Sequence, residues 1–137
     1  MKVKQSKLIV DTNLWISYLI SIGNKRLDKL IFSDKARLVF STELIDEFIE
    51  VSQRPKFIKY FHRDDVTKLL DLFDTYGELV KVKSDIQICR DYKDNFLLSL
   101  AFDSKANYLL TGDNDLLDLK KFGTTTIMTM SEFERQK

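Results

Sequence analysis

Short apolar runs alternate with segments of helical spacing along the whole chain. Apolar runs bounded by polar or turn residues predict buried strands at 7–10, 38–41, 79–82, 108–111 and 125–128. Apolar positions that recur every three or four residues predict helices near 14–21, 25–33, 42–53, 57–61, 64–76, 94–105, 114–118 and 131–136. The alternation predicts an α/β fold with a mainly parallel sheet, because parallel neighbours need crossover connections and these are usually helical.

The composition predicts one ordered domain over residues 1–137 in a reducing, cytoplasmic compartment. Of 137 residues, 44% are hydrophobic and only four are glycine and one is proline, which leaves little room for linkers. One cysteine and one histidine cannot form an intramolecular disulfide or a Cys/His zinc site. Asp11 and Asn13 interrupt the apolar stretch 8–20, so no membrane span is predicted. With a formal charge of +1, any affinity for nucleic acid must come from a local patch.

Acidic residues stand at the carboxyl ends of predicted strands, where open parallel sheets bind their ligands. Asp11, followed by a threonine and an asparagine, comes directly after the first strand. Asp113 and Asp115 follow the fourth strand across Gly112, which permits a tight turn. Each group has a structural alternative. Any of residues 11–13 could cap the next helix, and Asp115 could cap the short helix that it opens.

Two predicted helices each add one acid that can face inward. In the helix 42–53, Glu47 lies about 40° from Val51 at the edge of the apolar arc, whereas the other three acids turn toward the opposite side. The helix that starts near residue 94 is apolar almost all the way round, so Asp94 stands at a buried turn and Asp91 is left as a cap or supporting group. The alternatives are a half-solvated flank for Glu47 and helix capping for Asp94.

Taken together, the acids predict a site for a divalent cation. Clustered carboxylates repel one another and raise one another's pKa unless a cation neutralises them. Oxygen ligands without cysteine or paired histidines favour Mg²⁺ or Mn²⁺ over zinc. The chemistry that such a site indicates is phosphoryl transfer. The acids concerned are Asp11, Glu47, Asp94 and Asp113.

The motifs that carry these acids resemble the signatures of PIN-domain nucleases, and bacterial PIN-family toxins of toxin–antitoxin pairs in particular. The resemblance covers nearly the whole chain, from the first strand to residue 133. The order and spacing of the motifs match as well, and they read Val10-Asp11-Thr12-Asn13, Ser41 with Glu47 six residues later, Asp94-Asn95-Phe96-Leu97-Leu98-Ser99-Leu100-Ala101, and Thr111-Gly112-Asp113. Two positions depart from the pattern: Tyr92 stands where relatives commonly have proline, and Asn95 where a further acid is common.

The resemblance implies a three-layer α/β/α sandwich with strand order 3-2-1-4-5, one or two Mg²⁺ or Mn²⁺ ions, and endonucleolytic cleavage of single-stranded RNA. In such enzymes the metal activates water and balances the charge on the phosphate. An antitoxin partner and a homodimer are implied too. The catalytic and metal-binding acids would be Asp11, Glu47, Asp94 and Asp113. The auxiliary residues would be Thr12, Asn13, Thr111 and Asp115.

Cations and aromatic side chains alternate in the segment 54–63, as single-stranded RNA binding would require. The three- and four-residue spacing of Phe57, Tyr60 and Phe61 favours core packing of the rings instead. The basic side chains remain a candidate RNA-binding rim: Arg54, Lys56 and Lys59.

Two other classes of function compete with a metal-dependent endoribonuclease. An aspartate-based phosphatase needs a second aspartate two residues after the first, but residue 13 is asparagine, and a phospho-receiver domain needs a lysine after its last strand, which 125–129 does not supply. A non-catalytic PIN-fold module that binds RNA or protein is the other alternative, and the intact acids argue against it. The sequence therefore predicts an endoribonuclease that is the toxin of a toxin–antitoxin pair.

Overall fold

A computed structural model of the protein describes residues 6–20, 36–61, 67, 70, 71, 73–75 and 77–135. Its strands are β1 (Ser6–Val10), β2 (Ala36–Phe40), β3 (Gly77–Leu79), β4 (Tyr108–Leu110), β5 (Lys121–Phe122) and β6 (Thr125–Met128). Its helices are α1 (Thr12–Ile20), α3 (Thr42–Ser52), the 3₁₀ turn η1 (Ile58–Tyr60), α5 (Tyr92–Ser104), α6 (Asn114–Leu117) and α7 (Met130–Glu134). The helix predicted at 25–33 lies outside the described residues, and the helix predicted at 64–76 is described at six positions, all helical.

The strands form one sheet in the order β3-β2-β1-β4-β6-β5. The first five of these run parallel, in the predicted order 3-2-1-4-5, with β6 as the predicted fifth strand. β5 pairs antiparallel with β6 across a turn in which Gly123 has a φ of 59°. Two residues are too few to show an alternating pattern, which is why β5 was not predicted.

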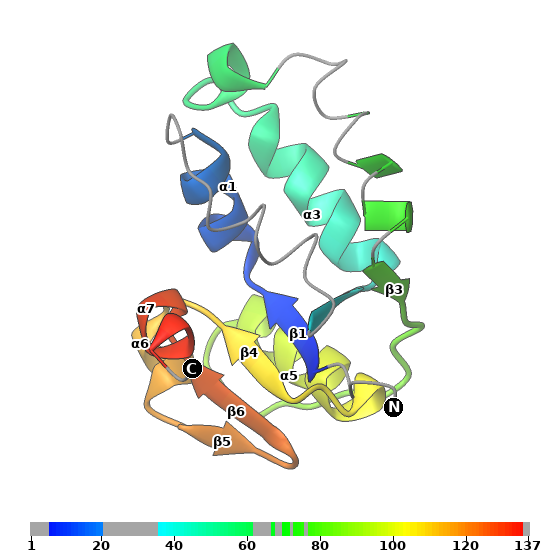
Figure 1. Ribbon diagram of the computed structural model, residues 1–137, viewed down its shortest axis with the longest axis vertical. Helices are drawn as coiled ribbons and strands as arrows, with labels where there is room; N and C mark the ends of the chain where they lie inside the picture. The colour runs from blue at the N-terminus through cyan, green and yellow to red at the C-terminus, as the bar shows by residue number, and fades with distance from the viewer. Residues whose placement is uncertain are drawn as a thin grey trace.

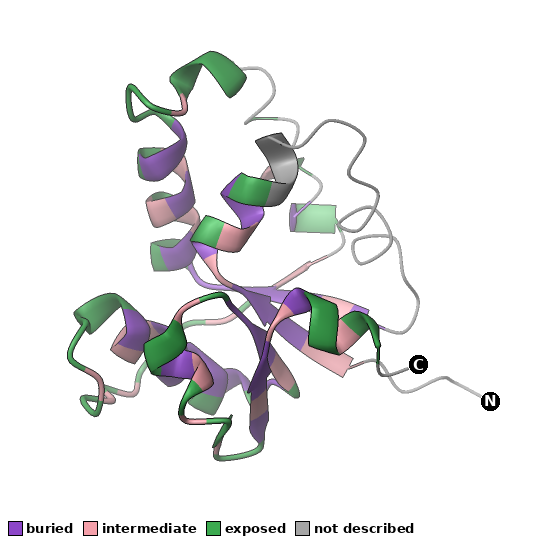
Figure 2. Ribbon diagram, turned by 90° about the vertical axis from the view of Figure 1, so that its left-hand side faces the viewer, coloured by how far each residue is buried: buried purple, intermediate pink, exposed green. Residues whose placement is uncertain are grey.

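Helices lie on both faces of the sheet, which confirms the predicted three-layer α/β/α sandwich. In Figure 1, α5 lies behind β1 and β4 while α7 lies in front of the sheet, and Figure 2 shows the strands between helices after a quarter turn. α1 and α3 pack against each other beyond the carboxyl ends of β1 and β2 (Figure 1). Within the described residues, no helix combines the length and the apolar character needed to cross a membrane.

The core explains why the central strands read as continuous apolar runs. The last three residues of β1 are at most 2% exposed, as expected for a parallel strand covered on both faces. An aromatic cluster joins α1 to β2: Trp15 lies 5.0 Å from Phe73, which stacks on Phe40 at 4.3 Å between ring centroids. Of the rings predicted to pack in the core from the 54–63 segment, Phe61 is buried, but Tyr60 is 48% exposed, so the prediction is wrong for Tyr60.

The third strand lies two residues earlier than the apolar run predicted. Gly77 opens it, and a side chain there would lie 2.6 Å from both the Phe40 ring and the Phe73 carbonyl oxygen, so glycine is required. Val80 N donates to Phe40 O at 2.7 Å, after which the chain leaves the sheet. Side chains of α5 then bind the backbone N–H groups of residues 83, 84 and 86.

Candidate functional site

The pairing of β1 with β4 positions the first acids. Val10 pairs with Leu110, and Asp11 N donates to Leu110 O at 3.0 Å. The residues that follow the two strands therefore lie side by side, and Thr111 Oγ1 donates to Asp11 Oδ2 at 2.9 Å. The same hydroxyl oxygen accepts a hydrogen bond from Asp113 N at 3.0 Å. One buried threonine thus binds two acidic residues.

Asp11 also caps α1. Its interpretation as a helix cap and its interpretation as a site residue are therefore compatible. Its Oδ1 accepts a hydrogen bond from Asn13 N at 3.3 Å, while Oδ2 faces Thr111. Burial raises the pKa of Asp11 above its ordinary value, and the charge of Asp113 adds to this, against the lowering effect of the Thr111 hydrogen bond. Thr12 is 1% exposed, and its hydroxyl oxygen is buried without a hydrogen-bond partner.

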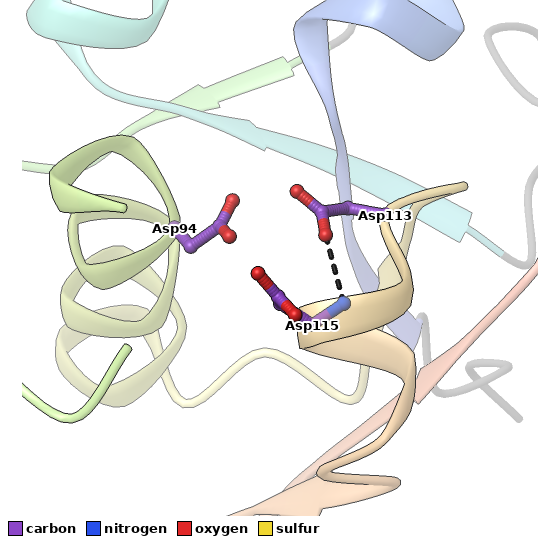
Figure 3. Close-up of side chains that lie close together, drawn as sticks. All are labelled: Asp94, Asp113 and Asp115. Carbon is purple, nitrogen blue, oxygen red and sulfur yellow. Dashed lines mark hydrogen bonds between the residues drawn. The ribbon is translucent and has the colours of Figure 1, made fainter. Parts of the chain in front are cut away.

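Asp94, Asp113 and Asp115 form the acidic cluster. One carboxylate oxygen from each lies within 4.8 Å of those of the other two. Figure 3 shows the three carboxylates gathered between α5, which carries Asp94, and the start of α6. Asp94 is 4% exposed, and its Oδ2 is buried with no hydrogen-bond partner.

The electrostatics of the acidic cluster fit a cation. Burial, together with the negative charges of Asp113, Asp91 and Asp11, raises the pKa of Asp94 to about 7. A buried carboxylate with an unpaired oxygen and acidic neighbours is stabilised by a positive ion. An all-carboxylate donor set is the kind that Mg²⁺ and Mn²⁺ prefer. The residues present therefore fit a divalent metal.

Glu47 approaches from α3. It is half-buried while Glu43, Asp46 and Glu50 are exposed, as the helical period predicted. Burial raises the pKa of Glu47, the charge of Lys93 lowers it, and that of Asp11 raises it. Within the described ranges, however, neither Glu47 nor Asp11 belongs to a group of three acids whose ligand atoms all lie within 4.8 Å of one another.

Two basic side chains border the acids and were not singled out from the sequence. Lys93 Nζ, in the first turn of α5, lies 3.9 Å from Glu47 Oε1. Arg90 Nη2 lies 3.7 Å from Asp115 Oδ1. The available signal was the alternation of basic and acidic residues from 90 to 94, but such alternation is common on solvated helix starts.

The helix caps decide two open alternatives. Asp91 caps α5 by accepting from Lys93 N at 2.9 Å, as predicted. Asp113 caps α6 by accepting from Asp115 N at 2.8 Å, so the alternative of Asp115 as the cap is wrong. The tight turn expected at Gly112 also differs: its φ is not positive, and a side chain there would meet nothing within 4 Å.

Three side chains along one face of α5, here called the α5 clamp, bind the backbone of residues 83–89. They are four residues apart: Asn95, Ser99 and Asp103. Asn95 Oδ1 accepts from the N–H groups of residues 88 and 89 at 3.0 and 2.7 Å, and its Nδ2 donates to the carbonyl of residue 89 at 3.0 Å. An acid at position 95 could not donate that last bond, which accounts for the asparagine there.

The candidate RNA-binding rim lies at the far end of α3 from the sheet (Figure 1). Arg54 pairs with Glu50 at 2.9 Å. Lys56 and Lys59 are exposed, and their ammonium groups lie 5.4 and 5.1 Å from the centres of neighbouring aromatic rings. The charge of Arg54 has a lowering effect on the pKa of Glu47, which burial raises, and the role of the rim in binding RNA stays a prediction.

The fold and the acidic cluster define a class of protein, an α/β protein of the PIN type whose acidic cluster fits a divalent metal ion. The PIN domain family matches residues 7–115 of the chain, a range that includes the acids of the site, and the chain belongs to this family. An uncharacterized protein of Methanocaldococcus jannaschii, MJ1680, is 34% identical over 118 residues, which are 83% of this chain and 75% of that protein. PIN domains are usually metal-dependent nucleases, and the acidic cluster fits a PIN active site.

Proposed function

We propose that the protein is a metal-dependent endoribonuclease that cleaves single-stranded RNA with Asp11, Glu47, Asp94 and Asp113. The observation that carries the proposal is the buried, unpaired oxygen of Asp94 within the acidic cluster. An ionised carboxylate buried in this way is costly for folding unless a cation occupies the site. The cost is compensated if the protein binds Mg²⁺ or Mn²⁺ there.

Hydrolysis of a phosphodiester joins a water oxygen to phosphorus, breaks the bond to one ribose oxygen, and transfers a proton from the water to that leaving oxygen. When bound, the metal ion would supply charge stabilisation at the phosphate and activate the water. The acidic cluster would hold the ion, and Thr111 would keep Asp11 oriented beside it. Lys93 and Arg90 would offer positive charge to the RNA backbone at the edge of the site.

The activity is tested by assaying a purified chain on single-stranded RNA with Mg²⁺ or Mn²⁺. Asp11→Asn and Asp94→Asn should each abolish metal-dependent cleavage, because each removes a charged oxygen from the site. Asp118→Asn is the matched control, since Asp118 is exposed at the C-cap of α6, outside the acidic cluster. Undiminished cleavage by correctly folded Asp11→Asn and Asp94→Asn variants would refute the proposal.

The choice of RNA and the role of a toxin rest on the resemblance of the motifs to PIN-family toxins. We therefore expect expression of the chain to arrest bacterial growth, and Asp94→Asn to relieve the arrest. Co-expression of the adjacent open reading frame should neutralise the wild-type chain and yield a complex with it. A growth arrest that persists in Asp94→Asn would exclude the nuclease as its cause.

A homodimer is the last part of the proposal. Light scattering of the purified chain should give twice the mass of the 16.1 kDa protomer.

The non-catalytic alternative is tested by calorimetric titration with Mn²⁺, because a module that has lost its chemistry should bind no metal ion at the acidic cluster.

A further inference from the structure

A groove of about 410 Å³ runs between the extended segment 84–89 and the start of α5. Tyr92 and Phe96, one helical turn apart, line it from α5, and Gln87 and Cys89 line it from the segment. Tyr92 is 78% exposed, although it is a large aromatic side chain. Exposed rings beside a cleft are a common means of binding flat ligands.

The groove opens beside the acidic cluster. Cys89, which lines the groove, directly precedes Arg90, whose Nη2 lies 3.7 Å from Asp115 Oδ1. Burial raises the pKa of Cys89, and the charge of Asp94 is the largest of the electrostatic effects that raise it further, followed by those of Asp115 and Asp113. A molecule bound at the Cys89 end of the groove would therefore lie near the acidic cluster.

The chemistry of the lining favours an uncharged, flat group. Within the described residues, the lining includes the carboxylate of Asp85 but no lysine or arginine, so a phosphate would be repelled. The two rings offer a stacking surface, and the side-chain carbonyl oxygen of Gln87 offers a hydrogen-bond acceptor. The positive side chains of the region face the acids instead, which is the side where a phosphate would bind.

The groove wall is held rigid before any ligand binds. The α5 clamp bonds the N–H groups of residues 83, 84, 86, 88 and 89, which fixes the segment against the helix. A wall that is already ordered loses little conformational entropy on binding. This favours recognition of a defined group over a loose surface contact.

We propose that this groove binds a nucleobase of the RNA next to the scissile phosphate, with the Tyr92 ring as its stacking platform. The inference rests on the proposed nuclease function and adds a subsite to it. Tyr92 acts on substrate binding, whereas the acids act on cleavage.

The test compares RNA affinity in the Asp11→Asn background, where cleavage is blocked, by fluorescence anisotropy with a labelled single-stranded oligonucleotide. Tyr92→Ala should weaken binding about 5- to 100-fold, because one base–aromatic stacking contact is lost. Tyr92→Phe should bind like the parent, since the ring is kept. Phe102→Ala is the matched control, as Phe102 is 56% exposed on the same helix outside the groove.

A set of oligonucleotides, each lacking one base, separates stacking from a structural effect. The loss caused by Tyr92→Ala should vanish for one abasic position and persist for all the others. Unchanged affinity in Tyr92→Ala, or an equal loss at every abasic position, would overturn the nucleobase subsite.

The outcome for the nuclease itself is read separately, from Mn²⁺-dependent cleavage by the chain with Asp11 restored. If the chain cleaves RNA but Tyr92→Ala binds RNA normally, the nuclease proposal is supported and the nucleobase subsite is refuted. If the effect of Tyr92→Ala depends on one base but no metal-dependent cleavage is seen, the subsite is supported and the nuclease proposal is refuted.

Discussion

At the scale of single residues, Asp94 is the residue whose burial costs the metal-free fold stability. Its side chain is 4% exposed, lies among other carboxylates, and keeps one oxygen without a hydrogen bond. An unfolded chain would hydrate that carboxylate fully. The metal-free protein therefore carries a cost at this residue that grows as the residue ionises.

This cost predicts how stability depends on pH. The pKa of Asp94 is 3.8 as an ordinary aspartate and about 7 in the folded protein, so between these values the folded state binds the proton and the unfolded state does not. The free energy of unfolding should therefore fall as pH rises from about 4 to about 7. Asp94→Asn should match the wild type near pH 3, where the carboxyl is protonated in both states, and exceed it at pH 8 by roughly 1–4 kcal/mol. Urea unfolding in EDTA at both pH values measures this, and identical pH profiles would contradict it.

At the scale of elements, two faces of α5 make different contacts. Its first turn carries Asp94 to the acidic cluster, and the α5 clamp holds the segment that forms the groove wall. Asp103 is the last residue of the clamp and accepts hydrogen bonds from Lys83 N, Ser84 N and Ser84 Oγ. Although burial raises the pKa of Asp103, these bonds outweigh it and hold the pKa below its ordinary value.

Removing the charge of Asp103 should therefore destabilise the protein most above its ordinary pKa. A lowered folded pKa gives stability that is present above the unfolded value of 3.8 and is lost as pH falls through the folded value. Asp103→Asn should cost about 1–2 kcal/mol near pH 7, a figure reduced for partial exposure, and the difference should shrink below about pH 3. Asp85→Asn is the control, because Asp85 is exposed and bonds only to Gln87 among the contacts described. Equal losses in the two variants at pH 7 would count against the clamp.

At the scale of the whole molecule, the site exists only in the folded chain. The acidic cluster joins α5 to the start of α6, and the pairing of β1 with β4 brings Asp11 to the same edge of the sheet. A cation held by side chains from separate segments binds the folded state alone. Metal binding should therefore stabilise the entire fold.

We expect Mn²⁺ at about one hundred times its dissociation constant to raise the free energy of unfolding by about 2.7 kcal/mol. Scanning calorimetry should show an upward shift of the thermal midpoint for the wild type, reversed by EDTA. Asp94→Asn should show little shift, whereas Asp118→Asn should behave like the wild type. An equal shift in all three would place the bound ion elsewhere.

Much of the fold and part of the site could be predicted from local patterns. The alternation of strand and helix gives the α/β class, since periodicity is a property of neighbouring residues. The helical period separated Glu47 from the three exposed acids of α3, and the apolar surroundings of Asp94 indicated its burial. Capping by Asp91 could also be predicted from local sequence, because a cap bonds to residues two or three positions away.

The sequence by itself determined most of the inward-facing side chains and, to within one residue, where β1, β2, β4 and β6 end. Only the tertiary structure decided which of those side chains meet: Asp115 joins Asp94 and Asp113, Lys93 reaches Glu47, and the α5 clamp binds the backbone that follows the predicted third strand. Thr111 and Asp11, which also meet, are a hundred residues apart in the chain. They depend on strand register and on helix placement, which are set by packing across the sheet and leave no periodic trace in the chain.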